Sequence, residues 1–423
     1  MQRRHFLQAG STLGTLGLVS GCASVGGSGP KVVVIGGGYA GATAAKYLRM
    51  WSEQKILVTL VEPNDAFISC PISNLVIGGS KTLSDITTPY NNLTQRHGVT
   101  IVKDRVSAID TEKRVVKLAG GTELSYDRLI VSSGVDFMWE TLPGMATAEA
   151  KDKVMHAWKA GAQTLTLRKQ LEAMPDGGVF AMSIPLAPYR CPPGPYERAC
   201  QVAEYFSKAK PKSKVLVLDA NDDVTSKGPL FKKAWAERYK GIVEYRSKHR
   251  VTDVDVAAIT LKFEFNDDVK ASVLNVIPDM RAGDIAVKTG LATANKRWCE
   301  VDFLTFESTA AKNVHVLGDS IQIAPGMPKS GHMANQHGKT CAAAVVALLM
   351  GKEVNPMPIY NNTCYSFVSS EDVVHVSSVH RYDPDKKTML TVPGSGGVSA
   401  AANELEGRYA HAWARNIWAD TLA

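Results

Sequence analysis

The sequence predicts an α/β protein with two doubly wound domains of the dinucleotide-binding type and a C-terminal α+β domain. Three observations lead to this prediction. A glycine-rich turn at residues 36–41 joins an apolar run to a helical run, a second strand, helix and strand pattern occupies residues 178–218, and a further segment begins at residue 346. The length of 423 residues also suits two or three domains rather than one core.

The composition excludes several classes of protein. Apolar residues make up 45% of the chain and charged residues 21%, which rules out a disordered, collagen-like or coiled-coil protein. The formal net charge is +7 and the basic residues form no cluster, so we expect no nucleic-acid partner. A weakly positive surface of this kind suits attraction of an acidic protein partner.

Residues 1–29 have the pattern of an export signal rather than of a folded element. Arg3 and Arg4 precede a weakly apolar stretch at residues 9–20 without acidic residues, which is typical of a bacterial twin-arginine signal. Such signals export folded proteins, often with a cofactor already inserted. The position of Cys22 alternatively fits a lipoprotein cleavage site. We therefore expect a periplasmic protein without a transmembrane segment, in a compartment where disulfides persist.

The first folded elements contain a dinucleotide fingerprint. A short apolar strand, a glycine turn and a helix follow one another over residues 31–50. Gly36 allows the tight turn, Gly38 lets the backbone approach a pyrophosphate, and Gly41 lets the helix pack against the strand. A second strand ends in Glu62, about 20 residues beyond the turn, where a carboxylate accepts hydrogen bonds from ribose hydroxyls.

Two later strand segments indicate which dinucleotide binds. Residues 126–134 and 313–319 resemble the paired strand motifs of the two-dinucleotide-domain flavoproteins, the glutathione reductase-like superfamily. In that superfamily the aspartate that matches Asp319 binds the ribityl chain of FAD. The resemblance therefore implies FAD bound by residues 36–62 together with Asp319.

A further part of the FAD site is expected at the start of the last large helix. Lys329, Ser330 and Gly331 precede a helix of small residues predicted over residues 332–350. The free N–H groups and the positive end of the helix dipole would face the flavin ring and stabilise its anionic reduced form. We therefore include these three residues in the cofactor site.

The second nucleotide-type domain lacks a phosphate-binding turn. Its first strand, at residues 178–182, leads into a segment at residues 183–195 that contains five prolines and one glycine. Proline has no N–H group, so this turn cannot bind a pyrophosphate. The doubly wound pattern continues with a helix at residues 196–208 and a strand at residues 214–218. The sequence thus argues against a nicotinamide dinucleotide as the electron partner.

These patterns set the expected domain boundaries. After the export signal of residues 1–29, residues 30–148 and 290–345 form a discontinuous FAD-binding domain. The second nucleotide-type domain occupies residues 149–289 and lies on the substrate side. Residues 346–423 form a C-terminal interface domain.

Three of the seven cysteines occupy positions that suit chemistry. Cys70 follows Glu62 closely, on the segment expected to fold over the flavin. Cys191 precedes a proline-rich helix start, where the helix dipole should lower the pKa of its thiol. Cys364 opens the C-terminal region, and a bridge to Cys191 would close a long loop. Three others, expected to be packed core thiols, are Cys200, Cys299 and Cys341.

No cysteine or histidine spacing is typical of a zinc site, and no Cys-x-x-Cys-His motif could attach haem to this chain. We therefore expect no metal ligands, and any haem must belong to a partner.

Four segments together resemble the flavoprotein subunit of flavocytochrome c sulfide dehydrogenase. They are residues 67–74, 190–198, 327–331 and 362–366, and the resemblance extends over residues 31–423. It implies that Cys70 holds FAD covalently through its 8α-methyl group. It also implies that Cys191 and Cys364 form a redox-active disulfide beside the flavin, and that a c-type cytochrome subunit completes a heterodimer.

The resemblance implies a sulfide:cytochrome c oxidoreductase whose substrate is a small sulfur species. Hydrosulfide would open the disulfide to a persulfide and a thiolate, and FAD would pass two electrons singly to a haem. Arg190 and Lys329 are candidates for holding anionic sulfur. Three alternatives stay open: a sulfide:quinone oxidoreductase, an accessory flavoprotein of a thiosulfate-oxidising system, and simpler roles in which Cys70 is a loop thiol and the bridge is structural.

The last part of the chain predicts an amphipathic helix. Leu405, Tyr409, Trp413 and Ile417 recur at four-residue spacing and form an apolar stripe. We expect this stripe to pack into the core, and the alternatives are a docking face for the cytochrome or contact with a membrane surface.

Overall fold

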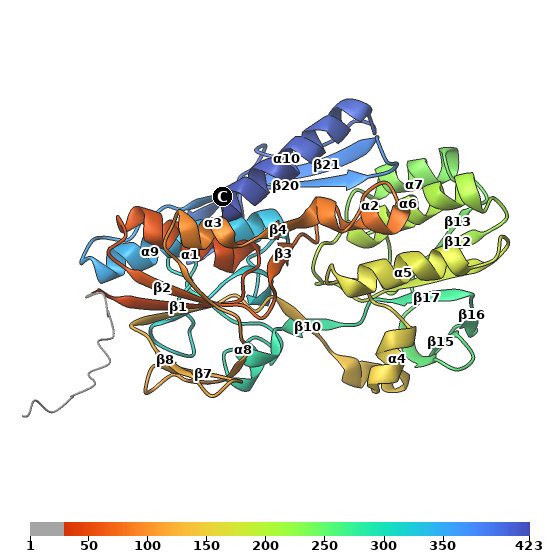
Figure 1. Ribbon diagram of the computed structural model, residues 1–423. Helices are drawn as coiled ribbons and strands as arrows, with labels where there is room; N and C mark the ends of the chain where they lie inside the picture. The colour runs from red at the N-terminus through yellow and green to blue at the C-terminus, as the bar shows by residue number, and fades with distance from the viewer. Residues whose placement is uncertain (1–28) are drawn as a thin grey trace, which may run out of the picture.

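The computed structural model describes residues 29–423 and has three parts, shown in Figure 1. Two parallel sheets covered by helices form the first two parts, and an antiparallel sheet with one long helix forms the third. The predicted fold class is thereby confirmed. The predicted export signal and Cys22 lie outside the described residues.

The first parallel sheet has the strand order β19-β9-β1-β2-β5. Its buried strands are covered by helices α1 and α9, which pack against each other. Strand β19 follows the whole second domain in the sequence and still pairs with β9, so this domain is discontinuous. The bounds are β1 (Lys31–Ile35), β2 (Leu57–Val61), β5 (Thr100–Val102), β9 (Arg128–Val131), β19 (Val314–Val316), α1 (Tyr39–Trp51) and α9 (Gly331–Leu349).

The second parallel sheet has the strand order β13-β12-β11-β17. An antiparallel pair, β10 with β18, connects it to the first domain. The proline-rich segment joins the end of β11 to the start of α6. The bounds are β10 (Val135–Phe137), β11 (Val179–Ile184), β12 (Lys214–Asp219), β13 (Val243–Arg246), β17 (Val273–Val276), β18 (Met280–Ala282), α5 (Ala162–Ala173), α6 (Gly194–Ala209) and α7 (Gly228–Glu237).

The C-terminal part, blue in Figure 1, reaches from the first domain to the second. Its strand β20 packs against α9 of the first domain and against α6 of the second. The bounds are β20 (Ile359–Phe367), β21 (Val373–Asp383), β22 (Thr388–Thr391), β23 (Gly397–Val398) and α10 (Glu404–Leu422). In the described range 29–423, no helix has both the length and the apolar character that a membrane span requires.

The apolar stripe of α10 packs only in part. Ile417 is 6% exposed, but Leu405 and Tyr409 are 48% and 52% exposed. The expectation that the whole stripe enters the core is therefore wrong for its N-terminal half.

Shorter elements complete the two domains. They are β3 (Ala66–Ile68), α2 (Ser73–Gly78), β4 (Thr87–Pro89), α3 (Asn91–Gln95), β6 (Val106–Asp110), β7 (Val115–Leu118), β8 (Glu123–Ser125), α4 (Ala148–Lys153), β14 (Val251–Asp255), β15 (Thr260–Phe263), β16 (Val269–Lys270), α8 (Asp284–Lys288) and four short 3-10 turns, of which η4 is Gly318–Ser320.

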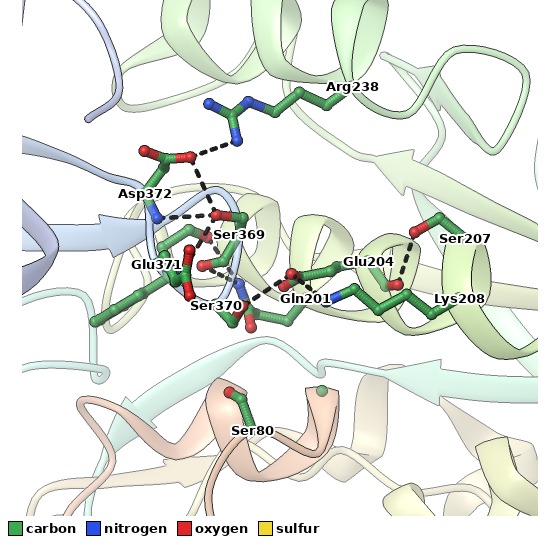
Figure 2. A network of polar contacts seen from close by, with 12 residues as sticks. Ser80, Gln201, Glu204, Ser207, Lys208, Arg238, Ser369, Ser370, Glu371 and Asp372 are labelled. Atoms are coloured by element: carbon green, nitrogen blue, oxygen red, sulfur yellow. Dashed lines mark hydrogen bonds and ion pairs between the residues drawn. The ribbon is translucent and has the colours of Figure 1, made fainter. Parts of the chain in front are cut away.

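Polar contacts hold the end of β20 against the second domain, as Figure 2 shows. The side-chain amide of Gln201 on α6 donates to the carbonyl oxygens of Phe367 and Ser369, at 3.2 and 3.0 Å. Arg238, next to α7, forms an ion pair of 2.6 Å with Asp372. The position of β20 relative to α6 is therefore fixed on both sides of the loop that follows the strand.

The contact between α1 and α9 provides a test of how the first domain is held together. A Cβ at Gly338 would lie 2.5 Å from the carbonyl oxygen of Ala40, a backbone atom that cannot rotate away. Gly338→Val should therefore lower the free energy of unfolding by about 3 kcal/mol, near the upper end of overpacking penalties. Urea denaturation measures this change. The control is Gly397→Val, where a Cβ would meet no atom within 4 Å. Equal urea midpoints for the two variants and the wild type would contradict the close packing of α1 against α9.

Candidate functional site

A cavity of about 500 Å³ lies where the three parts of the chain meet. This volume is within the range of small-molecule and cofactor sites. Eight of the predicted site residues line it, and they are Gly38, Glu62, Cys70, Cys191, Asp319, Ser330, Gly331 and Cys364. The three other predicted site residues, Gly36, Gly41 and Lys329, lie behind its wall.

The glycine turn leaves the start of α1 open to the cavity. Gly36 has φ +93°, and a Cβ there would lie 2.4 Å from the carbonyl oxygen of Ser132. A Cβ at Gly41 would lie 2.0 Å from the carbonyl oxygen of Gly36. At Gly38, the residue before α1, a Cβ would meet no atom within 4 Å. The backbone is thus accessible at the helix N-terminus, as binding of a pyrophosphate requires.

The carboxylate of Glu62 is fixed at the same end of the cavity. One of its oxygens accepts a hydrogen bond from the N–H of Gly37 at 2.7 Å, and the other accepts from the N–H of Asn64 at 2.9 Å. The second oxygen also accepts from the side-chain amide of Asn64 at 2.6 Å, so the capacity for a further hydrogen bond remains on the oxygen bonded to Gly37. Glu62 is therefore oriented to accept from ribose hydroxyls.

Asp319 and Lys329 are neighbours, but only Asp319 lines the cavity. Removal from water raises the pKa of Asp319. The ammonium group of Lys329 donates to the carbonyl oxygens of Asp319 and Ile321, at 2.9 and 2.6 Å, and lies 3.6 Å from the centre of the Trp298 ring. Burial lowers the pKa of Lys329 to about 7. Lys329 thus supports the Asp319 turn from behind.

The first turn of α9 faces the cavity through Ser330 and Gly331. The hydroxyl of Ser330 caps the helix by accepting from the N–H of Met333 at 3.1 Å. The same hydroxyl donates to the side chain of Asn362 on β20 at 2.7 Å. This pair of contacts connects the helix start to the strand that carries Cys364.

Arg190 is a half-buried cation on the cavity wall. Burial alone would lower the pKa of its guanidinium group, but negative charge on Cys70, Asp319 and Cys191 outweighs this effect and raises the pKa. One of its terminal nitrogens has no hydrogen-bond partner among residues 29–423. The indole N–H of Trp413, also on the wall, lacks one as well. Donors placed in this way fit the carbonyl groups of a flavin or a sulfur anion.

Cys191 and Cys364 face the same cavity from different parts of the chain. Both are free thiols in this structure. The expectation that the helix start lowers the pKa of Cys191 is wrong, because removal from water raises it, and the neighbouring Cys364 and Glu197 add to the rise. The helix dipole stabilises a thiolate by less than the free energy that removal of the thiolate from water costs.

The three remaining cysteines of the described chain are packed as expected. Cys200, Cys299 and Cys341 are fully buried. No group of three or more histidine, cysteine, aspartate or glutamate side chains within residues 29–423 is arranged to hold a metal ion.

Buried charges near the cysteine pair were missed from the sequence, and Glu197 and Lys227 are two of them. The carboxylate of Glu197 accepts from the side-chain amide of Asn74 at 2.7 Å and from the N–H of Phe367 at 2.9 Å, and burial raises its pKa. Lys227 donates to the carbonyl oxygen of Cys364 at 2.9 Å. Glu197 lies in the segment that carries the family resemblance, which was an available signal. Lys227 lies in a loop of polar residues, and this pattern gave no signal of a function.

The second nucleotide-type domain fills its own nucleotide position. Asp219, at the end of β12, accepts hydrogen bonds from the hydroxyls of Tyr196 and Tyr245, at 2.7 and 2.9 Å, and from the N–H of Asn221 at 3.0 Å. A carboxylate at this point of a dinucleotide-binding domain would otherwise accept from a ribose. These contacts agree with the absence of a phosphate-binding turn.

Three sequence profiles match the chain. Residues 30–173 match "Pyridine nucleotide-disulphide oxidoreductase". Residues 164–278 match "Sulfide dehydrogenase [flavocytochrome c] flavoprotein chain, central". Residues 356–422 match "Flavocytochrome c sulphide dehydrogenase, flavin-binding".

Relatives and solved structures agree with these matches. The mitochondrial sulfide:quinone oxidoreductase of Dictyostelium discoideum is 25% identical over 304 residues, which are 69% of this chain and 65% of that relative, slightly less than two thirds of its length. The crystal structure of the sulfide:quinone oxidoreductase from Aquifex aeolicus shares the fold, with a TM-score of 0.72 at 18% identity over 93% of this chain and 91% of that chain.

The sulfide dehydrogenase [flavocytochrome c] flavoprotein chain of Chlorobaculum thiosulfatiphilum is 59% identical over 46 residues, which are 11% of this chain and 94% of that relative. The chain therefore belongs to the family of flavocytochrome c sulfide dehydrogenase flavoprotein chains.

Proposed function

We propose that this chain is the flavoprotein subunit of a periplasmic sulfide dehydrogenase, which oxidises hydrosulfide and passes the electrons to a c-type cytochrome subunit. One observation carries the proposal. Cys191 and Cys364, far apart in the sequence, line the cavity that Cys70 and Asp319 also line. A cysteine pair beside a flavin site is the arrangement that couples a thiol–disulfide reaction to flavin chemistry.

The cysteine pair supplies the reaction with the substrate. Hydrosulfide bonds to the sulfur of Cys191, the bond between the two cysteines breaks, and Cys364 leaves as a thiolate that carries the electron pair. A second hydrosulfide attacks the outer sulfur of the persulfide, removes it as H₂S₂ and leaves Cys191 as a thiolate. When the two thiolates form the bridge again, two electrons go to the bound acceptor. Two hydrosulfides thus yield one H₂S₂ and two electrons.

Other residues of the cavity hold the acceptor and exclude competing chemistry. FAD supplies an acceptor of two electrons that can release them singly to a haem. The glycine turn, Glu62 and Asp319 would hold the nucleotide and ribityl parts, and a thioether at Cys70 would keep the cofactor on the protein outside the cell. The filled nucleotide position at Asp219 argues against reduction by a nicotinamide dinucleotide.

A second candidate function is a sulfide:quinone oxidoreductase. The similarity to the Dictyostelium discoideum and Aquifex aeolicus proteins of that name favours it. The two candidates share the sulfur chemistry and differ in the electron acceptor. Steady-state assays with a c-type cytochrome and with a short-chain quinone separate them.

Cys364→Ser should lower sulfide-dependent reduction of cytochrome c by about a thousandfold or more, because one member of the reacting pair is removed. The flavin should remain on the protein, since Cys364 does not attach it. Cys200→Ala removes a buried thiol away from the cavity and serves as the control. Wild-type turnover by Cys364→Ser would overturn the cysteine mechanism, and reduction of quinone but not of cytochrome c would favour the second candidate.

Acid precipitation tests the attachment of the cofactor. The yellow colour of the wild-type protein should precipitate with the polypeptide, whereas Cys70→Ala should release its flavin into the supernatant because the thioether is lost. Absorbance of the two fractions near the flavin maximum gives the result, with Cys299→Ala as the control. A wild-type flavin that stays in the supernatant would show that attachment at Cys70 is wrong.

A further inference from the structure

Lys227 is a buried cation directly beside the cysteine pair. It precedes α7 with φ +55°, and its side chain is 8% exposed. The ammonium group donates to the carbonyl oxygen of Cys364 at 2.9 Å and to the hydroxyl of Ser366 at 2.7 Å. It thus reaches from the second domain to strand β20.

No carboxylate lies within ion-pair distance of Lys227 among residues 29–423. A buried ammonium group without an ion pair is expensive to hold, and a structural hydrogen bond to a carbonyl oxygen can be made by a neutral donor. This cost points to a function for the charge.

The groups that face Lys227 come from three packed elements and from the segment before α6. They are Cys364 on β20, Glu197 on α6, Glu406 on α10 and Cys191 in the segment. Burial lowers the pKa of Lys227 to about 8, and negative charge on Cys364, Glu197, Cys191 and Glu406 opposes this shift. Among these groups the Cys364 thiolate has the largest effect. The carboxylate of Glu406 is already engaged by His375 at 2.9 Å.

We propose that Lys227 is a positioning residue that holds the thiolate formed at Cys364 when the bridge opens. This inference rests on the proposed function. Attack of hydrosulfide on Cys191 transfers one negative charge to Cys364 without moving a proton, and the ammonium group of Lys227 lies where it neutralises that charge. The same ammonium group fixes the backbone of Cys364 through its carbonyl oxygen. The bridge therefore opens toward Cys364.

The test measures the acidity of each thiol without turning over sulfide. The holoprotein is reduced under anaerobic conditions, desalted and treated with iodoacetamide between pH 6 and 10, and mass spectrometry of peptides gives the alkylation rate of each cysteine. Lys227→Gln keeps a donor for the carbonyl oxygen of Cys364 and removes the charge. Lys227→Arg keeps the charge. Lys232→Gln removes an exposed lysine of α7, the helix that Lys227 precedes, and is the matched control.

Lys227→Gln should slow alkylation of Cys364 at pH 7 by about tenfold, which corresponds to a rise of one unit in its pKa. For Lys227→Arg and Lys232→Gln, the alkylation rate of Cys364 should stay within about twofold of the wild-type rate, because both variants keep a positive charge at position 227. The difference in Cys364 alkylation rate between the wild type and Lys227→Gln should become smaller above about pH 8, because Lys227 then loses its proton. Equal rates for wild type and Lys227→Gln would overturn the proposal.

A second measurement needs no variant and decides the question if Lys227→Gln fails to fold. In the wild-type protein the pH midpoint of alkylation should be lower for Cys364 than for Cys191. A lower midpoint for Cys191 would contradict the assignment. If the proposed function is wrong, the protein does not oxidise sulfide but the alkylation profiles are as described. If the role of Lys227 is wrong, the alkylation profiles differ from those described. The two failures are therefore distinguishable.

Discussion

The buried carboxylate of Glu197 is the constraint on which the site depends. It accepts hydrogen bonds from Asn74, which follows Cys70 closely, and from the N–H of Phe367, which follows Cys364 on β20. Glu197 itself lies in the first turn of α6, the helix after Cys191. One side chain therefore connects the three segments that carry Cys70, Cys191 and Cys364. Without these hydrogen bonds a buried carboxylate would be strongly destabilising, so the segments are held together as a unit.

Desolvation of the cysteine pair sets the electrostatic problem that the site has to solve. Removal from water raises the pKa of both Cys191 and Cys364, which disfavours thiolates and favours either the neutral thiols or the bridge. Opening of the bridge by an anion therefore requires a fixed positive charge nearby. Lys227, Arg190 and Arg198 are cations close to the pair, and none is a residue of the nucleotide fingerprint.

Much of the fold and part of the site could be predicted from the sequence, because their signals are local. A glycine turn between strand and helix indicates its own conformation, and the family resemblance supplied the cysteines. The predicted lowering of the Cys191 pKa was wrong, because segments distant in the sequence bury this thiol. Lys227 was missed because its contacts with β20 come from distant sequence. In the N-terminal half of α10, Gly407 and Ala410 are buried whereas Leu405 is exposed, so a different face of the helix packs there than the spacing predicted.

The proposed sulfur chemistry requires that Cys191 and Cys364 form a reversible bridge beside the cavity. Mass spectrometry of the air-oxidised holoprotein, digested at acidic pH without reductant, detects such a bridge. A reversible bridge appears as one cross-linked peptide pair that joins these two cysteines and disappears when the protein is treated with sulfide under anaerobic conditions without an electron acceptor. Two free thiols, or either cysteine bonded to a different partner, would contradict it.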